Sequence, residues 1–98
     1  MGTVKVKIFG LLRLSLGISE VDIPVSSTLP LKEVLTLLKN FIPEEKITIF
    51  SEKLFENENL KPGVMILKNG VNVLHLAGLN TLINSGDTIS IFPPGGGG

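Results

Sequence analysis

Apolar and polar residues alternate along three stretches of the chain, a pattern typical of strands with one buried face. It predicts strands over residues 4–9, 21–25 and 88–92. The leucine-rich segment between the first two ends at Gly17, and we interpret it as a longish hairpin loop. Pro24 cannot donate a hydrogen bond to a neighbouring strand, which favours an edge position for residues 21–25.

One helix is predicted over Thr28 to Asn40. Its apolar residues recur at the spacing of a single helical stripe, namely Leu31, Val34, Leu35 and Leu38. Thr28 is a candidate N-cap, and Pro30 suits the first turn, where its missing N–H costs nothing. Pro43 blocks further extension. The stripe must be buried against another element, and the predicted sheet can supply that surface.

The region after this helix gives a less uniform pattern. Residues 44–62 combine helix-favouring charged residues with a β-branched run, so helix and strand both remain open there. Residues 64–68 and 71–74 flank Asn69-Gly70, a pair suited to a type I′ hairpin turn. In residues 75–83 leucines recur at helical spacing, interrupted by a glycine.

The order of these elements is strand, strand, helix, strand, strand, strand, which indicates an α+β fold. We expect a mixed sheet of about four to five strands, a usual size for small domains, with one main helix packed across it. The last strand is expected beside the first, in parallel. The 98 residues suffice for one domain. We predict that residues 1–94 form the folded domain and that residues 95–98 form a flexible glycine tail.

Composition excludes several classes of function. The chain has nine basic and nine acidic residues and no net charge, which argues against nucleic acid as the main partner. No apolar run is long enough to span a bilayer, and the first residues lead directly into a strand rather than a signal peptide. We therefore expect no membrane association and a cytoplasmic location. The absence of cysteine excludes disulfides, thiolate metal sites and cysteine nucleophiles.

No self-sufficient active site is visible. There is no nucleotide-binding glycine motif, and no metal site is predicted. His75 stands alone between leucines and is interpreted as a structural or edge residue. The serines lack a histidine–aspartate context and are typical of caps and turns. The carboxylates near Glu44 and Glu56 lie in solvated stretches without the burial that tunes a pKa for catalysis.

The unusual chemical group is the C-terminus itself. The last predicted strand ends at Phe92, Pro93 and Pro94 stop it, and the chain closes with Gly95–Gly98. Glycine has no Cβ, so such a tail can enter channels closed to other residues and present its carboxylate to a partner's active site. The alternative is that the glycines are only a linker or a cloning remnant.

Three segments carry a resemblance to a known family. Residues 68–73, 75–81 and 85–94, with the Gly-Gly end, resemble the β-grasp sulfur carriers and ubiquitin-like modifiers. These include the molybdopterin synthase small subunit, the thiamine sulfur carrier, the ubiquitin-related modifier and the small archaeal modifier proteins. The stretch between helix and hairpin looks like the molybdopterin synthase type. The chain departs from the family in placing Gly95 and Gly96, rather than larger or polar residues, after Pro-Pro.

The resemblance implies a β-grasp fold and a non-catalytic protein that carries sulfur for a synthase complex in molybdenum cofactor biosynthesis. A ubiquitin-activating-type enzyme would adenylate the Gly98 carboxylate with ATP, which this chain does not bind, and sulfur transfer would yield a thiocarboxylate. Gly95, Gly96 and Gly97 would thread the tail into the active sites of that enzyme and of a large synthase subunit. In the alternative, a ubiquitin-like modifier, Gly98 would be joined to target lysines. Nothing in the sequence separates the two.

A glycine tail binds weakly by itself, because ordering each residue costs about 1–2 kcal/mol. We therefore expect an apolar docking surface around Phe92, Pro93 and Pro94. From strand alternation alone, Phe92 suits this surface and the hydrophobic core equally well.

Overall fold

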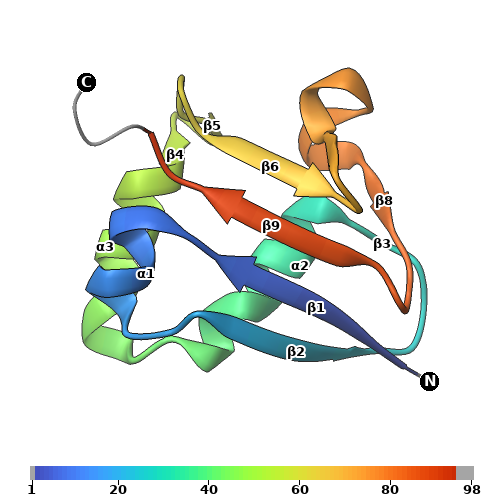
Figure 1. Ribbon diagram of the computed structural model, residues 1–98, viewed down its shortest axis with the longest axis horizontal. Helices are drawn as coiled ribbons and strands as arrows, with labels where there is room; N and C mark the ends of the chain where they lie inside the picture. The colour runs from blue at the N-terminus through green and yellow to red at the C-terminus, as the bar shows by residue number, and fades with distance from the viewer. Residues whose placement is uncertain (1, 95–98) are drawn as a thin grey trace.

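Five strands form one mixed sheet in the order β2-β1-β9-β6-β7 (Figure 1). The structure is a computed structural model and describes residues 2–94. The strands are β1 (Gly2–Ile8), β2 (Glu20–Val25), β6 (Met65–Lys68), β7 (Val71–Asn72) and β9 (Thr88–Phe92). The predicted number of strands is confirmed, and β2, which contains Pro24, lies at an edge of the sheet as expected.

The last strand of the chain, β9, lies at the centre of the sheet. It runs parallel to β1, with Ile8 opposite Ile91, and antiparallel to β6, with Met65 opposite Phe92. The expected parallel pairing of the first and last strands is confirmed. The C-terminal end of the chain therefore leaves the sheet between two neighbouring strands rather than from an exposed edge.

Three α-helices and several short elements complete the fold. The helices are α1 (Gly10–Leu16), α2 (Leu31–Leu38) and α3 (Ile47–Leu54). Four single 3-10 turns are η1 (Lys39–Phe41), η2 (Glu44–Lys46), η3 (Val73–His75) and η4 (Gly78–Asn80). Two short strand pairs are β3 (Leu29–Pro30) with β8 (Leu82–Ile83), and β4 (Phe55–Glu56) with β5 (Asn59–Leu60).

The segment interpreted above as a hairpin loop is helix α1, so that interpretation is wrong. Leu12 and Leu16, four residues apart, are fully buried on one side of the helix, while Leu11 and Leu14 are exposed. Gly17 ends the helix in the left-handed conformation, and its N–H donates to the Arg13 carbonyl oxygen. The helix packs against α3.

The main helix begins later than predicted, and Thr28 is not its N-cap. The Thr28 hydroxyl hydrogen-bonds the Asn84 side chain instead. Pro30 is the residue that precedes the helix, because Leu29 and Pro30 are held extended by pairing with β8. A tertiary contact therefore overrides the local capping signal. Helix α2 ends at Leu38, and η1 continues it as a tighter turn to Phe41.

The ambiguous region after α2 contains both kinds of structure. Residues 47–54 are helix α3, which buries Phe50 and Leu54, and a small hairpin follows it. The type I′ turn at Asn69-Gly70 is confirmed by positive φ values of 49° and 87°. Strand β7 is shorter than predicted. The expected helical pattern over 75–83 corresponds to a 3-10 turn followed by β8.

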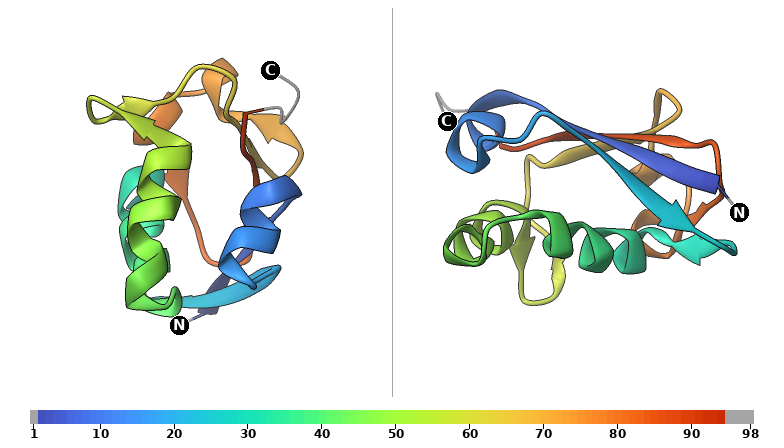
Figure 2. Two further views of the ribbon diagram at one scale, coloured as in Figure 1. Left: turned by 90° about the vertical axis from the view of Figure 1, so that its left-hand side faces the viewer. Right: turned by 90° about the horizontal axis from the view of Figure 1, so that it is seen from below.

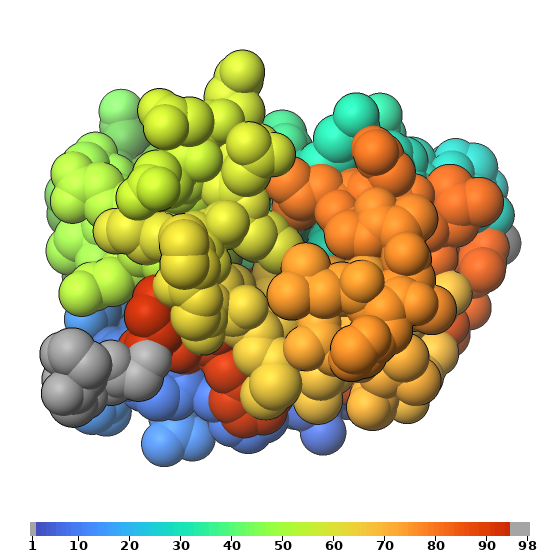
Figure 3. All heavy atoms as spheres, turned by 90° about the horizontal axis from the view of Figure 1, so that it is seen from above, coloured from blue at the N-terminus to red at the C-terminus, as the bar shows by residue number. Residues whose placement is uncertain are grey.

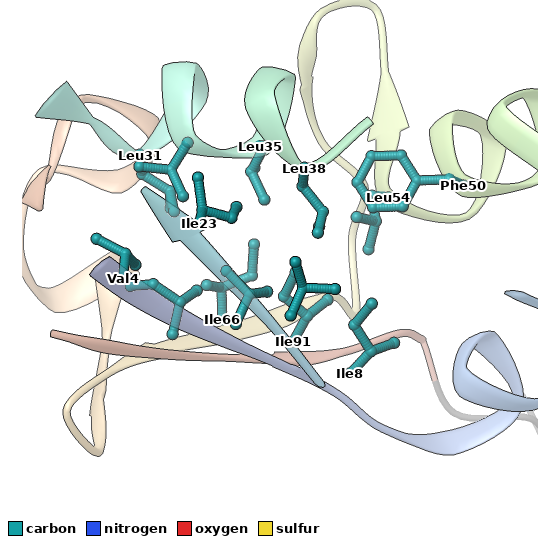
Figure 4. Close-up of a cluster of buried hydrophobic side chains, with 14 of the residues drawn as sticks. Val4, Ile8, Ile23, Leu31, Leu35, Leu38, Phe50, Leu54, Ile66 and Ile91 are labelled. Carbon is teal, nitrogen blue, oxygen red and sulfur yellow. The ribbon is translucent and has the colours of Figure 1, made fainter. Parts of the chain in front are cut away.

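Helices α2 and α3 lie on one face of the sheet, as the side view shows (Figure 2). The stripe of α2 faces the inward residues of β1, β2, β6 and β9, and Phe50 and Leu54 extend the same layer (Figure 4). Residues that point the other way along β1 and β9, including Lys5, Ser90 and Phe92, are only partly buried. The sheet therefore keeps a second, outward face.

Candidate functional site at the end of strand β9

The two parallel strands β1 and β9 end side by side. The N–H of Phe9, the first residue after β1, donates to the Ile91 carbonyl oxygen at 3.0 Å, so the ladder extends to the last residues of β9. Pro93 and Pro94 follow and cannot donate backbone hydrogen bonds. Gly95–Gly98, the predicted threading residues and reactive terminus, lie outside the described residues.

Phe92 lies on the outward face of the sheet. The neighbouring Ile89 and Ile91 are fully buried under the helices, whereas Phe92 is partly exposed and does not belong to the buried core. Its ring stacks on that of Phe9, with centroids 4.5 Å apart and planes 6° from parallel. The structure thus places Phe92 where a docking partner could reach it, although its role in docking stays a prediction.

A groove of about 400 Å³ runs between helix α1 and the end of β9. Gly10, Leu11, Arg13 and Leu14 line one side of it, and Phe92–Pro94 line the other. In the space-filling view the end of β9, in red, reaches the surface between β6 and the blue segment that contains α1 (Figure 3). The three predicted docking residues are therefore brought together at one surface depression.

Exposed apolar side chains surround this groove. Leu11 is 58% exposed and Leu14 is 70% exposed, and Met65, opposite Phe92 in the sheet, is 37% exposed. We refer to Leu11, Leu14, Met65, Phe92 and Pro93 as the tail-root patch. The sequence pattern does not predict the first three, Leu11, Leu14 and Met65, as part of a docking surface. The signal that could have found the leucines is the four-residue spacing of Leu12 and Leu16, which indicates a helix with Leu11 and Leu14 on its outer side.

The opposite end of β9 is fixed by a polar network. The Asn69 side chain accepts a hydrogen bond from the Thr88 N–H at 2.8 Å and donates one to Asp87 at 2.9 Å. Asp87 also accepts from the Asn84 N–H at 2.7 Å, and the Lys68 ammonium lies 3.8 Å from it. Partial burial of Asp87 acts to raise its pKa, but these hydrogen bonds and the Lys68 charge outweigh it, so the pKa is lowered. The network ties the Asn69-Gly70 hairpin to the start of β9.

An exposed charge cluster lies on the outward face at the β1–β2 pair, away from the tail-root patch. The Lys5 ammonium donates to Glu20 at 2.9 Å and lies 3.9 Å from Asp22. The hydrogen bond between Lys5 and Glu20, followed by their Coulomb attraction, raises the pKa of Lys5 and lowers that of Glu20. Since both side chains are well exposed, the pair contributes little to stability.

The other candidate residues do not form a reactive group. His75 is exposed, as are Glu44 and Glu56. Within residues 2–94, no three acidic or histidine side chains gather in an arrangement that could hold a metal ion. In the same part of the chain, no helix is long and apolar enough to cross a membrane.

Comparison with known proteins gives relatives of one kind. The model of the ThiS family matches residues 6–98. The chain is 48% identical over 46 residues to small archaeal modifier protein 3 of Haloferax volcanii, a match that covers 47% of this chain and 50% of that protein. The match thus spans about half the length of that curated relative.

Solved structures resemble the chain over nearly its whole length. Small archaeal modifier protein 1 from Methanosarcina acetivorans is 33% identical with a TM-score of 0.70, over 100% of this chain and 98% of that one. A putative molybdopterin converting factor subunit 1 from Pyrococcus furiosus is 25% identical with a TM-score of 0.69, over 97% and 100% respectively. The predicted β-grasp fold is confirmed by these likenesses.

Proposed function

This chain belongs to the ThiS family of ubiquitin-like β-grasp carriers and modifiers, and we propose that it is a sulfur carrier whose C-terminal Gly98 is converted to a thiocarboxylate. Members of this family are small carrier proteins rather than enzymes. On this proposal the chain would act as the small subunit of a molybdopterin-synthase-like complex.

The proposed chemistry needs a free carboxylate and an activating partner. The Gly98 carboxylate attacks the α-phosphorus of ATP in a ubiquitin-activating-type enzyme, which forms an acyl-adenylate and releases pyrophosphate. A hydrosulfide-level sulfur nucleophile then adds to the carbonyl carbon, and AMP leaves with the bonding electron pair. The sulfur is thereby held on the main chain, which suits a protein without cysteine. Because activation consumes ATP, we place the reaction in the cytoplasm.

One observation carries the proposal: the central strand ends at Phe92, and Pro93 and Pro94 follow it immediately before the terminal glycines. The described part of the chain therefore ends at an apolar surface. The tail-root patch would dock the activating enzyme and a large synthase subunit in turn. The likeness to the Pyrococcus furiosus converting factor supports the synthase assignment.

Intact-protein mass spectrometry tests the carrier function. The chain is co-expressed with the adenylating enzyme of its source organism, and we expect a species heavier by the difference between one sulfur and one oxygen atom. A variant that lacks Gly98 is the matched control and should keep its unmodified mass. Absence of the heavier species, with demonstrated pyrophosphate release, would contradict sulfur transfer.

The second candidate function is protein modification. The 48% identity to a small archaeal modifier protein supports it, because that protein is named for this role. The activated Gly98 carbonyl would then be attacked by a target lysine amine, which forms an isopeptide bond and releases AMP or an intermediate carrier. Lys68 is the last lysine or arginine of the sequence, so trypsin would leave residues 69–98 on the target lysine. Detection of that remnant supports modification, whereas co-purification of a large synthase subunit without it supports the carrier.

A further inference from the structure

Each of the two prolines at the end of β9 lies against a glycine of another segment. A Cβ placed on Gly10 would lie 3.3 Å from Cγ of Pro93, and one placed on Gly63 would lie 3.4 Å from Cβ of Pro94. The first distance is shorter than most side-chain contacts, and the second is at the short end of ordinary van der Waals contact. A side chain at position 10 would therefore press on Pro93, and one at position 63 would pack directly against Pro94.

The two glycines belong to the segments on either side of β9. Gly10 comes two residues after the end of β1, and Gly63 comes two residues before the start of β6. Since β1 and β6 are the neighbours of β9, the glycines flank the point where the chain leaves the sheet. We call Gly10 and Gly63 the proline seat.

Positive φ values alone do not distinguish Gly10 and Gly63 from the other glycines. Gly10 and Gly63 have φ values of +66° and +92°, which favour glycine. However, Gly70, Gly78 and Gly86 also have positive φ, and a Cβ on any of them would meet nothing within 4 Å. Among the described glycines with positive φ, Gly10 and Gly63 are those where a Cβ would come within 3.4 Å of another residue. The close approach of a proline is therefore a separate property of these two positions.

We propose that Gly10 and Gly63 are positioning residues for the tail: they hold Pro93 and Pro94, the two residues that lead into the terminal glycines, in a fixed place on the body. The inference rests on the proposed activation of Gly98. Gly95–Gly98 have no side chains, so Pro93 and Pro94 are the last residues whose side chains can contact the body of the protein. A proline also has a fixed φ, which transmits the orientation of the seat into the next residues. A side chain at Gly63, which lies outside the groove lining, would therefore misplace Pro94 and leave the exposed side chains of the tail-root patch in place.

The test uses asparagine, the side chain that tolerates positive φ best after glycine. Gly10→Asn is paired with Gly17→Asn at the other end of α1, where φ is +71° and the nearest atom to a Cβ is the Lys46 Nζ at 3.8 Å. Gly63→Asn is paired with Gly86→Asn, where φ is +93° and nothing lies within 4 Å. Each pair shares its backbone strain and differs in the contact with proline.

The measured quantity is the rate of ATP–pyrophosphate exchange by the adenylating enzyme of the source organism, as a function of the concentration of the full chain. We expect kcat to fall about tenfold in the two seat variants, less than the roughly hundredfold loss that a misplacement of about 1 Å can cause, because the contacts with the prolines are only slightly too short. KM should stay within a factor of about two in Gly63→Asn, because Gly63 does not line the groove and the variant keeps uniform binding. The two control variants should match the unsubstituted chain in both parameters.

A double substitution distinguishes the effect of the Gly10–Pro93 contact from a general destabilisation of the fold. Pro93→Ala removes the ring that contacts Gly10, so Gly10→Asn should cause little further loss of kcat in that background. An independent measurement needs no activation reaction. Nuclear Overhauser contacts show directly whether the protons of Gly10 lie close to those of Pro93, and the protons of Gly63 close to those of Pro94.

The outcomes distinguish the two proposals. If the unsubstituted chain supports no exchange, the proposed function fails and the positioning role fails with it. If it supports exchange and Gly10→Asn and Gly63→Asn react as fast as their controls, only the positioning role is overturned. The positioning role is also overturned if the losses of kcat from Gly10→Asn and Pro93→Ala multiply in the double variant. It is likewise overturned if the unsubstituted chain lacks the Overhauser contacts between these glycines and prolines.

Discussion

The rings of Phe9 and Phe92 stack on the outward face of the sheet, with centroids 4.5 Å apart and planes 6° from parallel. Phe9 follows the first strand of the chain and Phe92 is the last residue of β9, so the pair joins the end of β1 to the strand that leads into the tail. The stack places an aromatic surface beside Pro93, in the groove that helix α1 borders.

The first prediction concerns the stability of Phe92→Ala. Because Phe92 is partly exposed, we expect the substitution to lower the free energy of unfolding by about 1–2 kcal/mol, less than for a buried ring. Phe50→Ala is the control, since Phe50 is 0% exposed and should lose about 3–5 kcal/mol. Urea denaturation measures both. Equal losses in the two variants would mean that Phe92 acts as a core residue.

The second prediction concerns the energy of the stack. Comparing Phe9→Ala, Phe92→Ala and the double variant should give a coupling of about 0.5–1.5 kcal/mol, as for other aromatic pairs. The same variants should weaken binding to the activating enzyme in surface plasmon resonance, because the ring surface is part of the proposed docking site. Unchanged binding per folded molecule would exclude Phe92 from docking.

The third prediction concerns Gly97→Val. A β-branched side chain should not pass a channel shaped for glycine, so activation of Gly98 should be lost while the thermal midpoint stays unchanged. Pyrophosphate exchange and a melting curve measure the two effects. Gly70→Asn, at an exposed turn where a Cβ would meet nothing within 4 Å, is the control and should react normally. Normal thiocarboxylate formation by Gly97→Val would refute the threading role.

The fourth prediction concerns acid stability. The pKa of Asp87 is lowered from its ordinary value of 3.8, so the folded state binds the proton less readily than the unfolded state. Its contribution is present above the unfolded pKa and is lost as the pH falls through the lower, folded value. We therefore expect the free energy of unfolding to decrease as the pH falls below the ordinary value of 3.8, and to decrease less in Asp87→Asn.

The control for this measurement is Glu52→Gln, which alters an exposed carboxylate on α3. Its acid profile should follow that of the unsubstituted chain. At neutral pH, Asp87→Asn should also lose about 1–2 kcal/mol, because hydrogen bonds to a charged acceptor are stronger than those to an amide. Identical pH profiles for Asp87→Asn and the unsubstituted chain would show that the network does not depend on the charge.

Local pattern alone determined the elements whose signal is strong within a few residues. Alternation located β1, β2 and β9, the leucine stripe located α2, and Asn69-Gly70 specified a type I′ turn through its need for two positive φ values. The Phe-Pro-Pro-Gly ending also marked the root of the tail, since two consecutive prolines remove two backbone donors from the strand. The docking and threading roles of those residues remain predictions.

Tertiary contacts decided the rest. Leu29 and Pro30 are extended because β8 pairs with them, which shifts the start of α2 and leaves Thr28 to bond Asn84. Residues 10–16 are helical, with Leu12 and Leu16 buried together, and their four-residue spacing was a local signal for this helix, whereas the packing of the helix against α3 is a tertiary contact. The orientation of Phe92 toward Phe9, and the approach of Pro93 and Pro94 to Gly10 and Gly63, join residues separated by 31 or 83 positions. Such contacts depend on how the strands pair, and no local pattern contains that information.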